Sequence, residues 1–206
     1  MNKVEMLRIF LLGGEISAET KRQRLGIAWD IWESLPKIIQ EEMTLLFEEV
    51  KERLVEKLSN KDDWIIQNAF KFRYEKWSGV YLFKKSWTSE GNYLLSVALE
   101  PDNWSIVALT NMFISVRKSD SIEKVDFKSM GDELNNKFKR GSVPLGAKWV
   151  WYNYLEKYRY TNNRDFFEEL ASDRGKIIQY YAENLLSLKE ASEIIIDKTI
   201  EGYKPN

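Results

Sequence analysis

Any catalytic chemistry in this chain has to proceed without two common side chains, because its 206 residues include neither histidine nor cysteine. This composition excludes a histidine general base, a Ser-His-Asp triad and a thiolate nucleophile. It also excludes a disulfide framework and a zinc site built from Cys and His. Carboxylates and lysines remain, so a bound metal would have to be a hard cation such as Mg²⁺, Mn²⁺ or Ca²⁺ on oxygen ligands.

One set of acids and lysine has the order that this chemistry uses. Pro101-Asp102 is followed by Asp126-Phe127-Lys128, which is the skeleton of a metal-dependent nuclease site. In such a site both acids ligate Mg²⁺, and the lysine steadies the attacking water or the scissile phosphate. An intact Mg²⁺ nuclease that uses Asp102, Asp126 and Lys128 is therefore one hypothesis.

The surrounding sequence favours a structural role for these residues. Pro101-Asp102-Asn103 is typical of a turn. Asp126 follows a polar stretch without buried-strand character and is typical of a helix N-cap or first turn. A second acid-x-Lys triplet, Glu49-Val50-Lys51, falls on the solvated face of an amphipathic helix. We expect no catalytic residue and no cofactor, with Mg²⁺ required only in the nuclease alternative.

The order of helical and extended patterns predicts an α+β fold. Residues 1–33 are expected to form an N-terminal helical segment, and Ser34-Leu35-Pro36 is expected to open a helix over 34–58. Residues 65–118 are rich in β-branched and aromatic side chains, and their short connections favour antiparallel strands. Turn residues occur at Gly79, at 89–92 and at 101–103.

The C-terminal part, residues 126–203, is expected to be helical and rich in aromatic residues. A short helix should begin near Asp126, and KWVWYNYLEKYRY should form an edge strand or a loop. A long helix should run from about Arg174 to Glu201. We therefore predict an α+β domain over 34–206, with a small antiparallel sheet of three to four strands, N-terminal helices and a long C-terminal helix.

Aromatic anchors on the predicted strands and tail carry a family resemblance. The matching positions are Trp87, 93–100, 112–116, Trp149, 151–154, Phe166-Phe167, Leu170, Ile177-Ile178, Tyr181, Leu185-Leu186 and Ile195. From about residue 34 onward, this layout resembles the C-terminal accessory region of bacterial PD-(D/E)XK nuclease-like proteins, many of them near defence genes. The nuclease core, which holds the catalytic carboxylates of that family, is missing here. The resemblance therefore implies an accessory or recognition domain.

Basic and aromatic residues near the strand ends could contact a nucleic acid or a protein partner. They are Lys84, Lys85, Trp87, Arg117, Lys118, Arg140, Trp149 and Trp151. Since the net charge is −1, nucleic-acid binding would need such a local patch. On one sheet face they would form a phosphate-attracting groove with stacking platforms. The alternative is that the aromatics form the core and the lysines a solubilising rim.

Two binding functions follow as hypotheses. The first is a non-catalytic recognition or accessory domain of a PD-(D/E)XK nuclease-like bacterial defence or restriction protein, with DNA or RNA as partner. The second is a protein-interaction module, such as an immunity or inhibitor-type protein, that uses exposed aromatics and the acidic helix. The sequence has no run of about 20 apolar residues and no secretion signal, so we expect no membrane partner and a cytoplasmic protein.

Overall fold

The structure is a computed structural model, and its description covers most of the chain. The described residues are 2–14, 16–59, 61–69, 79–101, 104–105, 108–109, 111–120, 122, 127–138, 141–142, 148–161 and 163–203. The chain divides into two compact units, unit 1 from Met1 to Glu42 and unit 2 from Met43 to Asn206. Each unit is described by itself.

Unit 1 contains two helices whose starts are capped by polar side chains. Helix α1 spans Lys3–Leu12, and its N-cap Asn2 accepts a hydrogen bond from the Glu5 amide at 2.8 Å. Helix α2 spans Ala18–Lys57, and the Ser17 hydroxyl accepts from the Thr20 amide at 3.1 Å. These caps satisfy amides that have no partner within the first helical turn.

Helix α2 does not begin at Ser34, where the sequence pattern predicted a helix start. Instead it runs unbroken from Ala18, with Pro36 inside it. That prediction was wrong because a proline can also occupy a helix interior, where its fixed φ is compatible with the helix and the cost is one lost hydrogen bond and a steric strain. The division between the two units falls after Glu42, within α2.

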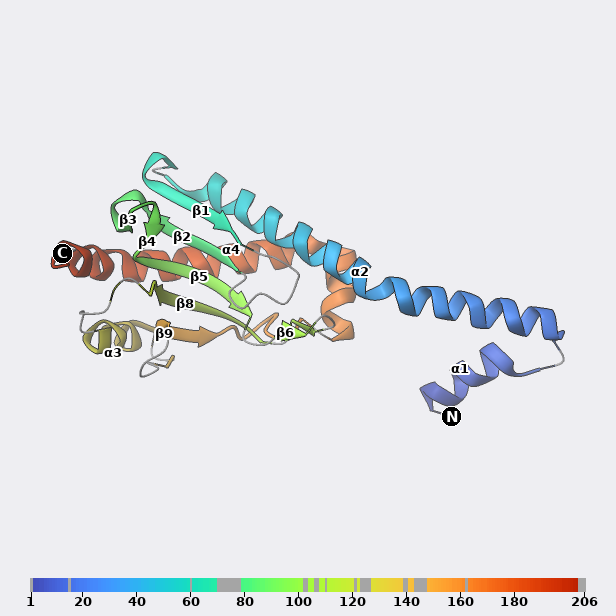
Figure 1. Cartoon of the computed structure of the whole chain (residues 1–206). Helices are drawn as coiled ribbons and strands as arrows, with labels where there is room; N and C mark the ends of the chain where they lie inside the picture. Colours follow the sequence, from blue (N-terminus) through green and yellow to red (C-terminus); the bar gives the residue numbers. More distant parts are fainter. Residues whose placement is uncertain are drawn as a thin grey trace. The chain divides into compact units, whose positions relative to one another are not determined.

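Unit 2 is built on a five-stranded antiparallel sheet (Figure 1). The strand order is β1-β2-β5-β8-β9. The strands span Trp64–Asn68 (β1), Val80–Lys84 (β2), Leu95–Pro101 (β5), Met112–Lys118 (β8) and Trp149–Tyr154 (β9). All four pairings are antiparallel, and a register shift between Val116 and Arg117 marks an irregularity where β8 meets β9.

Short elements connect these strands. Two pairs of two-residue strands are β3 (Thr88–Ser89) with β4 (Asn92–Tyr93) and β6 (Trp104–Ser105) with β7 (Ala108–Leu109). Between β3 and β4, Glu90 and Gly91 have φ values of 51° and 81°. This is the primed type of hairpin turn, in which glycine carries no steric penalty, and it confirms the predicted turn at 89–92. Two short 3-10 helices span Lys61–Asp63 and Lys85–Trp87.

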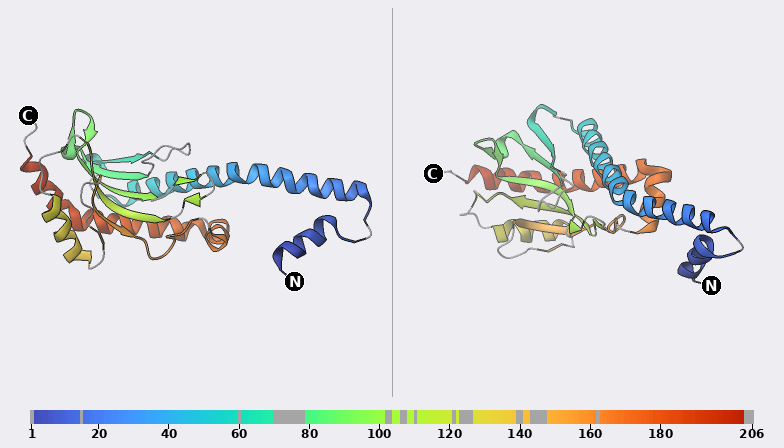
Figure 2. Two further views of the ribbon diagram at one scale, coloured as in Figure 1. Left: turned by 60° about the horizontal axis from the view of Figure 1, so that its bottom comes forward. Right: turned by 45° about the vertical axis from the view of Figure 1, so that its right-hand side comes forward.

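Two further helices complete unit 2. Helix α3 spans Phe127–Phe138, and helix α4 spans Arg164–Glu201 with Asn163 as its N-cap. Asp173 has non-helical dihedral angles, so α4 is two helical pieces joined at a kink. Helix α4 contacts β5 and β8, whereas α3 contacts β9 and α4. Both views of Figure 2 show α4 lying along the sheet.

The core of unit 2 lies between the sheet and its helices. From Met43 onward, α2 buries five apolar side chains, and the Phe47 ring stacks parallel to that of Tyr181 on α4 at 6.4 Å. The predicted α+β class is confirmed, including the antiparallel sheet and the long C-terminal helix. The main sheet has five strands because the aromatic segment Trp149–Tyr154 pairs with β8. Within the described residues, no helix is both long and apolar enough to span a membrane.

Candidate binding site at the strand ends of unit 2

The pairing register assigns the side chains of the sheet to two faces. The face toward α4 carries Leu82, Val97, Val116 and Trp151, which are cross-strand neighbours. Because successive strand residues point to opposite faces, the alternate positions of these strands belong to the second face, and the register shift between Val116 and Arg117 brings Trp149 onto it as well. This second face carries Tyr81, Phe83, Ser96, Ala98, Glu100, Phe113, Ser115, Arg117, Trp149 and Tyr152.

A buried ion pair lies on the second face. Glu100 and Arg117 are 1% and 4% exposed, and the Arg117 guanidinium donates to Glu100 Oε1. Glu100 also accepts hydrogen bonds from Tyr81 Oη at 3.1 Å, Ser115 Oγ at 2.7 Å and Trp149 Nε1 at 2.9 Å. These hydrogen bonds and the guanidinium partner offset the free-energy cost of burying the Glu100 carboxylate.

The network fixes the protonation states of its members. Burial opposes the charge on Arg117, but Glu100, Tyr81 and Tyr93 together outweigh burial and raise the pKa of Arg117. Burial, and then the charge of Glu100, raise the pKa of the Tyr81 hydroxyl. Burial likewise raises the pKa of Tyr93. Both phenols therefore stay neutral donors across the physiological pH range, and Arg117 stays a cation.

Aromatic rings surround this ion pair. Tyr93 stacks on Tyr81 with a centroid distance of 5.8 Å and lies 5.4 Å from Phe83. On the other side, Phe113 makes edge contacts with Trp149 and Tyr152 at 5.7 and 5.8 Å. These ring contacts hold the network in one geometry, because offset and edge arrangements of aromatic rings are favourable.

A cleft of about 300 Å³ opens beside Arg117, where β4, β8 and β9 meet. We call it the strand-end cleft. It is lined by Asn92, Tyr93, Arg117, Lys118, Ser119, Asp120 and Lys148. Two backbone hydrogen bonds hold its walls together, from the Lys118 amide to the Lys148 carbonyl at 2.8 Å and from the Ser119 amide to the Leu94 carbonyl at 2.9 Å.

The lining of the cleft is mainly cationic. Three of its side chains are cations and one, Asp120, is a carboxylate that pairs with Lys148 at 3.0 Å. The Lys118 ammonium lies 5.0 Å from the centre of the Phe127 ring. Neutral donors, including the Tyr93 hydroxyl and the Asn92 amide, accompany these cations. This combination can bind an anion such as a phosphate group.

Two of the predicted contact residues belong to the other face of the sheet. Lys84 lies on the α4 side, where its ammonium pairs with Asp197 at 2.6 Å and with Glu193 at 2.8 Å. Trp87 is completely buried, and its Nε1 donates to Asp197 Oδ1 at 2.7 Å. Both residues therefore connect the sheet to α4. The expectation that they share one surface with Arg117 is corrected, because the register places Lys84 on the face opposite Arg117 and the hydrogen bond to Asp197 places Trp87 against α4.

The remaining predicted contact residues are distributed over unit 2. Trp151 is fully buried on the α4 side and donates to Asn135 Oδ1 on α3 at 2.8 Å. It thus lies in the core, where it cannot present a ring to a ligand. Trp149 is half-buried in the Glu100 network, and Lys85 is exposed after β2. Arg140 lies outside the described residues, so of the predicted contact set the cleft contains Arg117 and Lys118.

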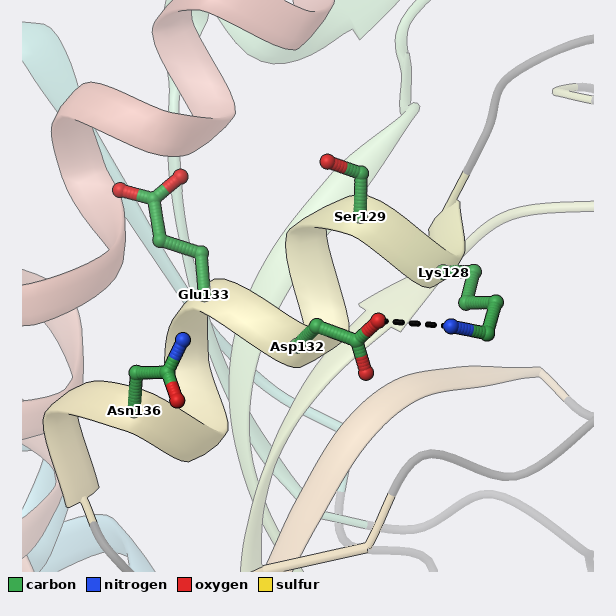
Figure 3. A pocket seen from close by; sticks show the side chains of 5 residues that line it. All are labelled: Lys128, Ser129, Asp132, Glu133 and Asn136. Atoms are coloured by element: carbon green, nitrogen blue, oxygen red, sulfur yellow. Dashed lines mark hydrogen bonds and ion pairs between the residues drawn. The ribbon is translucent and has the colours of Figure 1, made fainter.

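The predicted nuclease trio is only partly described. Asp102 and Asp126 lie outside the described residues. Lys128 lies on the exposed side of α3, where it pairs with Asp132 at 2.8 Å, and both line a shallow pocket with Ser129, Glu133 and Asn136 (Figure 3). Among the residues that the structure describes, no group of three or more potential ligands of the Asp and Glu type is placed to hold a metal ion.

The residues of the candidate site that were not predicted from the sequence include Tyr81, Tyr93, Glu100 and Lys148. One signal could have indicated the ion pair. Glu100 ends the apolar strand YLLSVALE and Arg117 follows the apolar run MFISV, so each places a charge on a strand that is otherwise buried. Charges in such positions are rarely buried unless they are paired. Lys148 gives no comparable signal, since it reaches the cleft only through the pairing of β8 with β9.

Comparison of the chain with protein families, with curated proteins and with solved structures gives no match.

Proposed function

We propose that the chain is a non-catalytic recognition domain that binds the phosphates of a nucleic acid in the strand-end cleft. The observation that supports this proposal is the presence of Arg117, Lys118 and Lys148 around one cleft with a single carboxylate in its lining. Lys and Arg that neutralise phosphates supply most of the affinity in sequence-independent binding.

The buried ion pair gives the cleft a rigid wall, in which Glu100 balances the charge of Arg117. Arg117 is held by Glu100 and by Tyr81, to which its guanidinium donates at 2.8 Å. It needs little reorganisation on binding, which lowers the entropic cost of binding. Lys118 and Lys148, half-buried at the rim, are the residues that a phosphate would meet first.

The biological setting of this proposal comes from the family resemblance. In this setting, the domain accompanies a PD-(D/E)XK nuclease-like bacterial defence or restriction protein and acts in the cytoplasm. The aromatic anchors that carry the resemblance include Trp149, which donates to Glu100 beside the cleft. Recognition and cleavage would then belong to different parts of a defence system.

The test is a salt titration of nucleic-acid binding by the whole chain. Fluorescently labelled single-stranded DNA, duplex DNA and RNA are titrated by anisotropy at 50 and 200 mM salt. We expect binding that weakens with salt, and we expect Lys118→Glu with Lys148→Glu to weaken it about tenfold or more, because two phosphate contacts are reversed. Lys198→Glu is the matched control, since Lys198 is exposed on α4.

Two results would contradict the proposal. One is the absence of binding at low salt, and the other is an equal loss of affinity in the Lys198→Glu control. The Lys85→Glu variant asks whether the exposed lysine after β2 belongs to the binding surface. Incubation with Mg²⁺ addresses the nuclease alternative, which predicts cleavage that Asp126→Ala abolishes.

A protein-interaction module is the second candidate function. It is favoured by the exposure of apolar side chains in unit 1. Of the described large apolar residues that are exposed, thirteen belong to residues 1–42 and four to residues 43–206. Exposed apolar surface that is this concentrated is typical of a protein-binding site.

A further inference from the structure

The strand-end cleft has room for one small ligand group. Its volume is about 300 Å³, which is at the lower end of the roughly 300–1,000 Å³ of small-molecule pockets. A length of nucleic acid is far larger, so the cleft takes in one nucleotide or its phosphate and leaves the rest of the strand outside. The shape and the charge of the cleft therefore decide which phosphate of a strand can enter.

A nearly buried cation forms the inner end of the cleft. Arg117 lines the cleft, yet its side chain is only 4% exposed. Lys118 and Lys148 are half-buried and so lie nearer the opening. A phosphate inside a strand has a nucleoside on both sides, whereas a terminal phosphate has a nucleoside on one side only. A terminal phosphate can therefore point into a narrow site that an internal phosphate touches only at its rim.

The charges around the cleft leave a positive surplus that one carboxylate of the chain reduces. Glu100 balances Arg117, so the surplus comes from Lys118 and Lys148. Asp120 lies in the same lining, and its Oδ2 pairs with the Lys148 ammonium at 3.0 Å. Two lysines and one carboxylate give a net charge of +1 in this state. When Asp120 turns away, the two lysines give +2.

Asp120 occupies the position of an anion in the cleft and is easily displaced from it. Its side chain is 79% exposed, so it can turn into solvent without disturbing the core. Exposed ion pairs of this kind contribute little free energy. Burial is the main cause of the raised pKa of Tyr93, and the charge of Asp120 adds to it. The Asp120 carboxylate thus acts on two groups of the lining, Lys148 and Tyr93.

We propose that the strand-end cleft binds the terminal phosphate of a nucleic-acid strand, and that this phosphate displaces Asp120 from Lys148. A phosphate monoester carries a charge of about −1.5 to −2 at pH 7 and three acceptor oxygens. A phosphate within a strand carries a single negative charge. The charge of +2 that remains after Asp120 turns away matches the monoester, and the lysines and the Tyr93 hydroxyl are donors for its oxygens. The chain therefore recognises an end of a strand.

This inference rests on the proposed function, because it names which phosphate of the nucleic acid enters the cleft. The two can fail separately. Salt-sensitive binding that is the same for all strand ends would contradict the inference and leave the proposed function intact. Absence of binding to every nucleic acid would contradict both.

The first experiment compares single-stranded DNA oligonucleotides of one sequence that differ only at their ends. One has a 5′-phosphate, one a 3′-phosphate and one hydroxyl groups at both ends, with the fluorescent label on an internal base. In anisotropy titrations of the whole chain, we expect at least one phosphorylated form to bind about tenfold more tightly than the hydroxyl form, because charge-assisted hydrogen bonds are the strong ones. Lys148→Gln should reduce this preference to about threefold or less. Lys128→Gln is the matched control, since Lys128 also pairs with an aspartate but lies on α3, and it should preserve the preference.

The second experiment tests the displacement of Asp120. Asp120→Asn removes the competing carboxylate and should raise the affinity for the preferred phosphorylated oligonucleotide about three- to fivefold, which corresponds to the strength of an exposed ion pair. Asp132→Asn is the matched control, because Asp132 pairs with Lys128 at 2.8 Å outside the cleft lining. It should leave the affinity unchanged. Equal gains in both variants would reduce the effect to net charge and overturn the role of Asp120.

A third measurement separates a strand end from a free phosphate ester. Inorganic phosphate and thymidine 5′-monophosphate compete against the labelled, phosphorylated oligonucleotide. Because they lack the further phosphates of a strand, we expect them to displace it only at concentrations about tenfold or more above that of the unlabelled oligonucleotide. Equal potency of the mononucleotide would overturn the strand end as the ligand and assign the cleft to a free nucleotide. Equal affinity of the phosphorylated and hydroxyl oligonucleotides would overturn the inference altogether.

Discussion

Units 1 and 2 have similar helix-forming sequences but opposite relations to water. In unit 1, helix α1 has no buried residue, and the first buried residue of α2 is Met43, where unit 2 begins. In unit 2, α4 buries ten side chains against the sheet and its neighbouring helices. Both regions have apolar residues at helical spacing, so spacing alone does not explain the difference. What unit 2 has in addition is a sheet that offers a complementary apolar face.

The comparison shows that amphipathic helices need a partner surface to become a folded core. Helix α4 finds its partner in β5 and β8 of the same chain. In unit 1, helix α1 has no buried residue, and the printed contacts between α1 and α2 among the described residues are those of Arg24 with the Phe10 carbonyl and ring. The sheet of unit 2 therefore supplies the apolar surface against which its helices bury their side chains, and unit 1 contains no sheet among its described residues. The following changes test this contrast, from the largest expected effect to the smallest.

Loss of Trp87 should have the largest effect on unit 2. Its side chain is fully buried, contacts Trp64 edge to face at 5.2 Å and donates to Asp197. Trp87→Ala should lower the free energy of unfolding by about 4 kcal/mol, as large-to-small changes of buried aromatics do. Urea unfolding followed by circular dichroism measures this loss. A loss below about 1 kcal/mol would mean that this part of the core is not tightly packed.

Neutralisation of Glu100 should be nearly as damaging. Glu100→Gln leaves the buried charge of Arg117 without its counter-charge and should cost about 3 kcal/mol. Glu100→Gln combined with Arg117→Met removes both charges, keeps an acceptor for Ser115 and Trp149, and should recover at least half of the loss. An additive double variant in the urea titration would contradict a direct ionic coupling.

Removal of the Lys84 ammonium should have an intermediate effect. Lys84 pairs with Glu193 and Asp197, and its side chain is 18% exposed. Lys84→Met keeps the alkyl stem against the Trp64 and Trp87 rings but leaves two acids on α4 without this partner. We expect a loss of about 2 kcal/mol in the free energy of unfolding. Lys85→Met, at the exposed neighbour, is the control and should change stability by less than about 0.5 kcal/mol.

The same ion-pair cluster should make unit 2 sensitive to acid. Burial works against it, but the hydrogen bonds from Lys84 and Lys189 lower the pKa of Glu193 below its ordinary 4.5. A lowered folded-state pKa stabilises the protein above pH 4.5, and this stabilisation is lost as the pH falls through the folded-state pKa. Thermal melts at pH 6 and pH 3 should therefore differ less in Glu193→Gln than in the unchanged protein, by up to about 1 kcal/mol. Equal differences would refute this contribution.

Loss of Trp32 should have the smallest effect on folding, although Trp32→Ala removes the same side chain as Trp87→Ala. Trp32 is 66% exposed and belongs to unit 1. Trp32→Ala should change the free energy of unfolding of unit 2 by less than about 0.5 kcal/mol. A loss comparable with that of Trp87→Ala would contradict the exposure of Trp32.

Much of the fold could be predicted from local patterns. The described residues between 65 and 118 form antiparallel strands, and a turn lies at 89–92, as expected. The short helix predicted to begin near Asp126 is α3, Phe127–Phe138, in which Met130 and Leu134 are buried. The start of the helix at Ser34 was wrong, because the local capping signal cannot exclude that the helix continues on its N-terminal side. The association with a nuclease stays a prediction.

The residues of the candidate site were harder to predict from the sequence, because the site depends on which strands pair and on which face of the sheet each side chain lies. Arg117 and Lys118 were predicted as contact residues, but Lys148 and Tyr93 join them only through the pairing of strand ends. Lys84 looks equivalent to them in the sequence, yet it faces α4. A shift of one residue in register would exchange these faces, and short-range patterns do not specify the register of a strand that is apolar on both sides.

The sequence by itself determined the chemistry that this protein can use and the kinds of element it forms. Without histidine and cysteine, its ionic chemistry is that of carboxylates, lysines, arginines and phenols, and its hydrophobic periodicity specifies strands and helices. The tertiary structure alone decided that Glu100 meets Arg117 and that Trp87 is buried while Trp32 is exposed. The reason is physical: chemical type is a property of each residue, whereas burial and pairing depend on which distant surfaces the folded chain brings together.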